Sequence, residues 1–207
     1  MSPTLRTDRR EQIVEVATRL FSRGGYRGTT LDDIAAEIGF TKPAIYYWFD
    51  SKEAILFEIH DRIVRGSLER VAQIRADPGR AADQLRQVFS SHVETLLDNR
   101  AANEVFNRFQ HELSPPRLRT IRGRDAEYES LLREIYAEGV SDGSLCPLDP
   151  QVAVGAMLGA VNSMYRWYRP HGDLARADVV HEVLSVLEDG VHRGGEDPAH
   201  DDVQLDD

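Results

Sequence analysis

The sequence predicts an all-α protein. Apolar residues recur at spacings of three and four along most of the chain, as in Leu85, Phe89 and Val93. No alternating run rich in valine, isoleucine and threonine lies between hairpin turns, so strands are not expected. The chain has 207 residues, of which 41% are hydrophobic and 29% charged, so it is long enough to bury a sizeable core.

Helix-ending residues divide the chain into about nine helices. Gly24 ends the first helix, Gly39 can close the second in the left-handed conformation, and Pro78 breaks the chain after the fourth. The expected helices cover residues 7–23, 31–38, 42–48, 52–76, 79–98, 100–112, 115–141, 150–168 and 175–192.

Helix-starting residues support the same division. Thr30 followed by Asp33 resembles a capping box, with aspartate where glutamate is more usual. Ser51 is the expected N-cap of the fourth helix. Ser114 and Asp149 each stand before a proline, which favours the first position of a helix.

Charge and composition predict three parts. Residues 1–65 hold ten basic and ten acidic residues, so the net charge of −10 comes from the remainder of the chain. A small N-terminal domain is expected over residues 1–50 and a larger helical domain over residues 51–193. Residues 194–207 hold six acids and little that is apolar, so a disordered acidic tail is expected there.

Several classes of protein are disfavoured. No dinucleotide, phosphate-loop, zinc-protease or serine-hydrolase motif occurs, so we expect neither catalytic residues nor a cofactor. Cys146 is the only cysteine, and His111 and Glu112 are adjacent and do not share a helix face, so no metal site is expected. No apolar run approaches the roughly 20 residues of a membrane helix, and a cytoplasmic protein is expected.

The second and third expected helices have the features of a helix-turn-helix. Both are short, and the sequence IGFT, which contains a glycine, joins them. In such a unit the second helix enters the major groove of DNA. Ile45 and Phe49 lie four apart and can face the core, while Tyr47 and Trp48 project outward. The pattern alone also fits an aromatic core segment, or the binding surface of a helical protein adaptor.

A resemblance favours the DNA-binding alternative. The stretch TTLDDIAAEIGFTKPAIYYWFDSKEAIL resembles the DNA-binding module of TetR-type transcriptional repressors, and IVEVATRLFSRGGYRGTT resembles the helix before it. The resemblance implies an all-α homodimer that binds a palindromic operator on double-stranded DNA. It also implies a larger body that binds a ligand and forms the dimer.

The resemblance implies a set of DNA-binding residues. They are Thr30, Thr41, Lys42, Pro43, Ala44, Tyr46, Tyr47, Trp48 and Lys52. Within this set, Thr30 and Lys52 match phosphate contacts, and the start of the third helix faces the bases. Arg6, Arg9 and Arg10 form an N-terminal arm that either reaches phosphates or stays solvated.

The last two helices are the expected dimer contact. The helix over residues 150–168 carries the small residues Gly155, Ala156, Gly159 and Ala160, which allow close helix approach. The helix over residues 175–192 carries a stripe of valine and leucine. Two copies of this pair suit a two-fold four-helix interface, and the resemblance implies the same contact.

The segment NSMYRWYRPHGDL resembles the same region of TetR-type regulators that respond to acyl-CoA thioesters in fatty-acid and steroid-ring catabolism. A small apolar effector is therefore expected, an acyl-CoA thioester among the candidates, with another hydrophobic or aromatic compound as the alternative. Candidate ligand-binding residues are Arg166, Trp167, Tyr168 and Arg169, with Phe89, His92, Phe109 and Tyr128. The alternative for Trp167 and Tyr168 is that they anchor the helix end. For His92 it is a hydrogen-bonded core histidine.

Overall fold

The computed structural model describes residues 3–169, 172 and 174–191, and within these residues it contains helices and no strand. The prediction of an all-α protein is confirmed. The expected acidic tail over residues 194–207 lies outside the described residues. No helix in the described part of the chain is both long and apolar enough to span a membrane.

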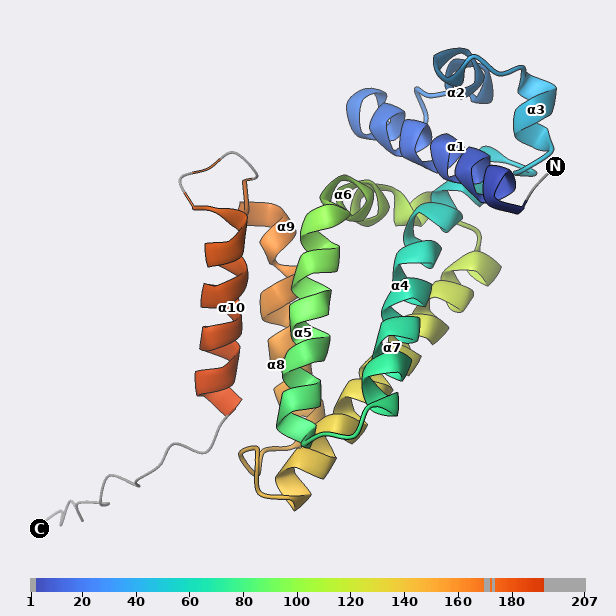
Figure 1. Cartoon of the computed structure of the whole chain (residues 1–207). Helices are drawn as coiled ribbons and strands as arrows, with labels where there is room; N and C mark the ends of the chain where they lie inside the picture. The colour runs from blue at the N-terminus through green and yellow to red at the C-terminus, as the bar shows by residue number, and fades with distance from the viewer. Residues whose placement is uncertain (1–2, 170–171, 173, 192–207) are drawn as a thin grey trace, which may run out of the picture.

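Three helices form a head at one end of the molecule, namely α1 (Pro3–Gly24), α2 (Leu31–Ile38) and α3 (Lys42–Tyr46) (Figure 1). The predicted capping box is confirmed, because the Asp33 amide donates to the Thr30 hydroxyl and the Asp33 carboxylate accepts from the Thr30 amide. Gly39 ends α2 with φ of 75°, in the left-handed region that glycine adopts without strain.

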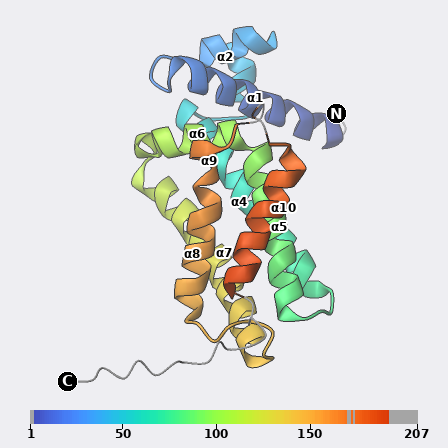
Figure 2. The ribbon, with the colours of Figure 1, turned by 90° about the vertical axis from the view of Figure 1, so that its left-hand side faces the viewer.

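The remaining helices form the body. The long ones are α4 (Lys52–Ala76), α5 (Ala81–Asp98), α7 (Pro115–Ser141), α8 (Pro150–Asn162) and α10 (Arg176–Val191). The helix α6 (Arg100–Phe109) lies across the upper end of the body beneath α1, and a 3₁₀ turn, η1 (Gln110–Glu112), follows it (Figure 2). The short α9 (Met164–Trp167) follows α8. In Figure 1, α10 and α4 lie on opposite sides of the body.

Several helix bounds differ from the expected ones. The first helix begins at Pro3 rather than residue 7, so the expected arm belongs to α1. The expected helix over residues 150–168 divides at Ser163, whose hydroxyl donates to the Ala160 carbonyl at 2.7 Å. Ser51 and Asp149 cap their helices as predicted, whereas the Ser114 side chain makes no capping bond.

Two hydrophobic clusters hold the fold together. One fills the body between α5, α7, α8 and α10. The other joins the three head helices and the first half of α4 to Ala102, Val105 and Phe106 of α6, and to Leu113 and Ile121. The packing of the head therefore continues past residue 50, and α6 belongs to the head core as well as to the body.

Candidate functional site

The α3 segment, meaning α3 and the residues up to Phe49, presents two tyrosines above a buried pair. Ile45 and Phe49 are buried with exposed fractions of 0% and 3%, as predicted. Tyr46 and Tyr47 are 49% and 64% exposed. Trp48 is only partly buried, and its ring meets that of Tyr47 edge-on with the centroids 4.9 Å apart. This short helix therefore exposes an aromatic surface that its own fold does not cover.

The start of α3 holds a paired cation. The Lys42 ammonium donates to Asp32 Oδ2 on α2 at 2.7 Å, and this hydrogen bond raises the pKa of Lys42 above its ordinary value. Thr41 and Pro43 are exposed and Ala44 is half-buried. Since this bond uses one of the three N–H donors of Lys42, the ammonium can still donate to a second acceptor, although Asp32 offsets its charge.

Thr30 is engaged in its own capping box. Its hydroxyl donates to Asp33 Oδ2 at 2.7 Å and accepts from the Asp33 amide at 3.1 Å. The bonds that the Asp33 carboxylate accepts from the Thr30 amide, at 2.8 Å, and from the Thr30 hydroxyl lower the pKa of that carboxyl below its ordinary value. The hydroxyl thus fixes the start of α2. Its single proton is already donated to Asp33, so the hydroxyl could donate to a phosphate only in place of that bond.

Lys52 points into the head rather than away from it. Its ammonium donates to the carbonyls of Tyr26 and Thr29 at 2.7 and 2.8 Å, and it stands 4.3 Å from the centre of the Tyr26 ring. Partial burial lowers the pKa of Lys52. Two of its three N–H donors therefore hold the turn between α1 and α2, a role that sequence analysis did not predict.

An ion-pair chain connects the head to the body. Arg10 of α1 donates to the Trp48 carbonyl at the end of the α3 segment and pairs with Glu58 of α4 at 2.8 Å. Arg65 bridges Glu58 to Asp61, at 3.1 and 3.0 Å, and Asp61 pairs with Arg124 of α7. Glu58 and Asp61 are buried, so this chain spans α1, α4 and α7 in a partly desolvated setting.

Arg9 also packs within the head, with its guanidinium 5.3 Å from the centre of the Phe40 ring. The side chain of Arg6 lies outside the described residues. The described arginines of the expected arm therefore make contacts within the fold.

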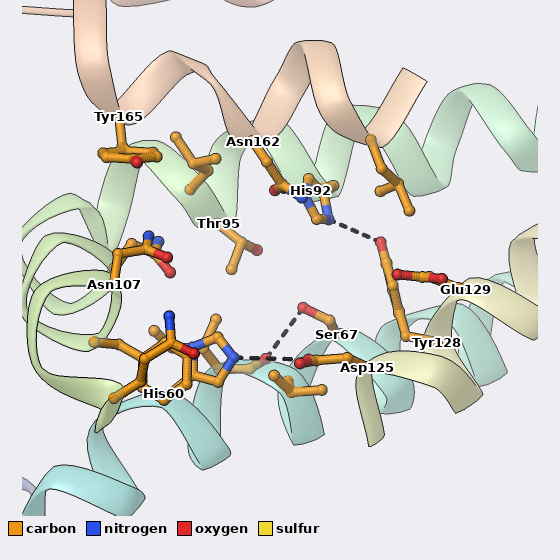
Figure 3. A pocket seen from close by; sticks show the side chains of 17 residues that line it. His60, Ser67, His92, Thr95, Asn107, Asp125, Tyr128, Glu129, Asn162 and Tyr165 are labelled. Atoms are coloured by element: carbon orange, nitrogen blue, oxygen red, sulfur yellow. Dashed lines mark hydrogen bonds and ion pairs between the residues drawn. The ribbon is translucent and has the colours of Figure 1, made fainter. Parts of the chain in front are cut away.

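A cavity of about 370 Å³ lies in the body between α4, α5, α6, α7 and α8 (Figure 3). Ile63, Val64, Leu96, Phe106 and Leu158 are its apolar lining residues. The rest of its lining is polar, made of His60, Ser67, His92, Thr95, Asn103, Asn107, Gln110, Asp125, Tyr128, Glu129, Asn162 and Tyr165. The size falls within the range of about 300–1,000 Å³ typical of small-molecule sites.

His92 belongs to a closed hydrogen-bond network at one end of the cavity. Its Nε2 lies 2.9 Å from Asn162 Oδ1, an acceptor, so Nε2 carries the proton. Its Nδ1 then accepts from the Tyr128 hydroxyl at 3.0 Å. Burial lowers the pKa of His92 and raises that of Tyr128, which favours the neutral forms that this network requires.

His60 stands at the other end, between α6 and α7. Its ring stacks on Phe106 with centroids 3.8 Å apart and planes 7° from parallel. Its Nε2 lies 3.6 Å from Asp125 Oδ1, and its Nδ1 is buried with no hydrogen-bond partner among the described residues. The stacking fixes the ring, so the imidazole and the carboxylate face each other in a set position.

Comparison with known proteins identifies the family. Residues 13–59 match the bacterial regulatory proteins of the tetR family, and residues 78–191 match the tetracyclin repressor-like C-terminal domain. The second match alone covers more than half of the chain. The chain belongs to the TetR family. It is a ligand-responsive, DNA-binding transcriptional regulator and not an enzyme, as the sequence predicts.

Three known proteins match nearly the whole chain. A TetR/AcrR-family transcriptional regulator from Thermobifida fusca YX-ER1 is 46% identical, with a TM-score of 0.73, over 90% of this chain and 100% of that one. The HTH-type transcriptional repressor KstR2 of Rhodococcus jostii strain RHA1 is 27% identical, over 90% of this chain and 92% of that protein. AibR, solved in complex with isovaleryl coenzyme A and operator DNA, is 26% identical, with a TM-score of 0.73, over 86% of this chain and 97% of that one.

The cavity of this TetR-family regulator contains two of the eight predicted ligand-binding residues, His92 and Tyr128. Phe89 is buried in the core of the body. Phe109 packs against the head cluster and lies 6.2 Å from the Tyr26 ring. The prediction from bulky residues therefore mixed cavity residues with core residues, because both kinds lie on the apolar faces of the helices.

The four predicted residues after α8 lie outside the cavity lining. Tyr168 is buried in the body core, and Trp167 is 50% exposed. Arg166 donates to the Tyr165 hydroxyl at 2.9 Å, and Arg169 donates to backbone carbonyls of its own turn. The break at Ser163 turns this segment, so Tyr165 alone of it reaches the cavity.

Sequence analysis missed most of the polar lining, although one signal was present. Asn103, Asn107 and Gln110 are spaced four and three residues apart, so they form an amide stripe on one face of α6 and η1. His60 and Asp125 offered no such signal, because they meet only through the packing of α4 against α7.

Proposed function

We propose that this protein is a repressor that reads a palindromic operator by inserting α3 into the major groove. The observation that carries the proposal is the exposed pair Tyr46 and Tyr47 above the buried Ile45 and Phe49. Exposed aromatic surface of this kind marks an interaction site, and tyrosine hydroxyls donate to phosphates. The proposed contact set is Thr30, Thr41, Lys42, Pro43, Ala44, Tyr46, Tyr47, Trp48 and Lys52.

Within this set, the contacts support three different roles. The exposed Thr41, Pro43 and Lys42 stand at the start of α3 and face bases, with Lys42 donating to a base or phosphate. Tyr46 and Tyr47 bind the DNA backbone and base edges. Lys52 acts mainly through the α1–α2 turn, which it holds with two hydrogen bonds.

A selection of bound sequences from random double-stranded DNA tests this function. The full chain is expected to enrich a palindrome whose half-sites match two α3 helices of one dimer. A folded protein that enriches no sequence would contradict the proposal and would favour a protein-binding adaptor. Since the proposed target is chromosomal DNA, we also propose that the protein acts in the cytoplasm.

We propose that two copies associate through α8 and α10, the helices expected over residues 150–168 and 175–192. One side of α8 is open in the single chain, where Val152, 67% exposed, continues into small exposed residues. These are Gly155, Ala156, Gly159 and Ala160. On α10, which contacts α8, Val186 is 70% exposed. An uncovered apolar face on two adjacent helices supports a two-fold four-helix interface.

We propose that the effector binds in the cavity and releases the operator. AibR was solved with isovaleryl coenzyme A and operator DNA, and this relative supports an acyl-CoA thioester as one effector class. The proposal keeps His92 and Tyr128 as effector-binding residues and adds His60, Asn107 and Asp125, which line the same cavity. Thermal unfolding with and without acyl-CoA thioesters, followed by operator release, tests it.

The route from cavity to operator runs through α4 and α6. Phe106 of α6 lines the cavity and also belongs to the head core, so a ligand that moves α6 acts on both. On α4, His60 faces the cavity, while Glu58 pairs with Arg10, which holds the Trp48 carbonyl. An effector that favours another arrangement of these helices changes the separation of the two α3 helices and lowers operator affinity.

A further inference from the structure

The charge of the cavity lining restricts the chemistry of the effector. Asp125 and Glu129 line the cavity, and none of the described lining residues is a lysine or arginine. An ionised carboxylate bound beside them would therefore meet charges of its own sign, although the two side chains are 42% and 50% exposed and water screens part of the repulsion. An apolar group would leave the polar side chains without hydrogen-bond partners, which is also unfavourable.

We propose that the enclosed part of the effector is uncharged and bears a hydroxyl group, which donates to Asp125 and accepts from a side-chain amide N–H. This inference rests on the proposed function, in which the cavity is the effector site. It departs from the small apolar ligand that the sequence predicts.

Asp125 is the acceptor that the structure leaves open. Its side chain is 42% exposed, and Nε2 of His60 lies 3.6 Å from its carboxylate, a separation longer than a hydrogen bond. The neighbouring Arg124 does not neutralise it, because that guanidinium pairs with Asp61. Glu129 is a weaker candidate, since Arg133 lies 3.6 Å from its carboxylate on the same helix.

Hydrogen-bond donors reach the cavity from α6 and η1. Asn103, Asn107 and Gln110 bring side-chain amides to the cavity from α6 and η1, and Figure 3 shows Asn107 across the cavity from His92. A carboxylate beside amide groups offers acceptors and donors together. A hydroxyl group matches this mixture because it donates one hydrogen bond and accepts others.

The hydroxyl position follows from which polar groups are already paired. At one end, both ring nitrogens of His92 are taken by Tyr128 and Asn162, at 3.0 and 2.9 Å. At the other end, Asp125 lacks a short hydrogen bond, since Nε2 of His60 lies 3.6 Å from its carboxylate. The hydroxyl group therefore belongs at the end of the cavity formed by His60 and Asp125.

The test compares ligands that share a skeleton and differ in one group. The first set is butyryl, 3-hydroxybutyryl and succinyl coenzyme A, which have the same four-carbon chain. The second set avoids coenzyme A and consists of decahydro-2-naphthol, its methyl ether and decahydronaphthalene-2-carboxylate. Binding to the full-length protein is measured by calorimetry and by thermal unfolding. In the set that binds, we expect the hydroxyl compound to bind at least tenfold more tightly than both others.

Two variants test whether Asp125 causes the preference for the hydroxyl compound. Asp125→Asn is expected to reduce the preference for the hydroxyl compound over the carboxylate by tenfold or more, because the like charge is removed. Glu127→Gln makes the same change in charge on an exposed position of the same helix, outside the cavity lining, and is expected to keep the wild-type preference. If Asp125→Asn does not fold, the comparison of hydroxyl and carboxylate on the wild-type chain still decides.

Three results would overturn the inference. They are carboxylates that bind as tightly as the alcohols, an unchanged preference in folded Asp125→Asn, and no binding by any compound at millimolar concentration. Operator binding is measured on the same samples. A chain that binds its operator but shows no hydroxyl preference overturns this inference alone, whereas a chain that binds no operator overturns the proposed function.

Discussion

Tyr47 is the most exposed of the large residues on the α3 segment, and its ring rests edge-on against Trp48. Because a hydrogen bond to a charged group contributes about 1.5–3 kcal/mol, Tyr47→Ala is expected to weaken operator binding by about tenfold or more. The melting temperature of the free protein is expected to change little, since the side chain is mostly solvated. Titration of the selected operator, followed by fluorescence anisotropy, measures the first effect.

Tyr47→Phe is the matched control for that substitution. It keeps the ring and its contact with Trp48 and removes only the hydroxyl. Equal losses for Phe and Ala would assign the contact to the hydroxyl, and a loss for Ala alone would assign it to the ring. An operator affinity unchanged in both variants would show that the reading surface has been placed on the wrong residues.

Glu53 links the start of α4 to the start of α7 and gives stability a pH dependence. Its carboxylate accepts from the Ser114 amide at 2.9 Å and lies 3.3 Å from Arg117, and the bond with Ser114 holds the pKa of Glu53 below its ordinary value. A depressed carboxyl pKa means that the ionised form is favoured in the folded state. The stabilisation is therefore complete above the ordinary glutamate pKa of about 4.3 and is lost as pH falls through the lower folded value.

The Glu53→Gln variant tests this sign. Its melting temperature is expected to lie below that of the wild type at pH 7, and the difference is expected to shrink as both proteins are acidified to pH values below the folded pKa. Glu127→Gln on the exposed face of α7 carries the same charge change as a control. A difference that stays constant, or grows on acidification, would contradict the assignment.

At the scale of helices, capping residues allowed most of the fold to be predicted from the sequence. Thr30, Gly39, Ser51 and Asp149 act locally, through the backbone of their own turns, so their positions alone locate the helix ends. The division at Ser163 was not predicted, because no glycine or proline marks a helix end in this stretch of the sequence.

The cavity was harder to predict than the helices. Its lining comes from five α-helices of the body, with η1 and α9 contributing one residue each. No single repeating pattern in the sequence therefore identifies the residues that line it. His60 and Asp125 are 65 positions apart along the chain and meet only in the folded body. His92 was found because it interrupts an apolar stripe, and that same signal does not separate a ligand-binding histidine from one paired within the core.

Two glycines of α7 are expected to respond in opposite directions when replaced by alanine. A Cβ atom at Gly139 would lie 2.5 Å from Leu145 Cδ1 and 2.8 Å from its Cγ, whereas nothing lies within 4 Å of a Cβ at Gly123. Gly139→Ala is therefore expected to destabilise the protein by about 1–3 kcal/mol. Gly123→Ala is expected to stabilise it by roughly 0.5–1 kcal/mol, through helix propensity.

Urea denaturation of both variants measures these changes. Each serves as the control for the other, since the substitution and the helix are the same. A neutral Gly139→Ala would mean that the loop carrying Leu145 moves aside without cost, so that the close approach of this loop to α7 does not constrain the residue.

At the scale of the whole molecule, the proposed dimer requires that the open side of α8 be covered by a second copy of the chain. Ala156 lies on the open side of α8, where an arginine would place a charge and a long side chain within the interface. Ala156→Arg is therefore expected to yield a monomer with much weaker operator binding, because the two α3 helices would no longer be linked. Sedimentation velocity at several concentrations measures the association state.

Ala72→Arg is the matched control for this substitution. Ala72 is exposed, and the helix that carries it, α4, lies on the opposite side of the body from α10 (Figure 1). The control variant is expected to remain dimeric. If both variants were dimers, the interface would have to lie elsewhere than on α8. If both were monomers, the cause would be a general loss of stability.

The sharing of Phe106 between head and body limits how freely evolution and engineering can exchange parts of this protein. The helix α6 follows the head by about fifty positions along the chain, and it covers the underside of the head core with Ala102, Val105 and Phe106. A fragment cut after α3 would lose these side chains and expose apolar surface to water. A hybrid regulator with a borrowed reading head is therefore expected to fold and bind DNA only when α6 is taken with that head or matches it in shape.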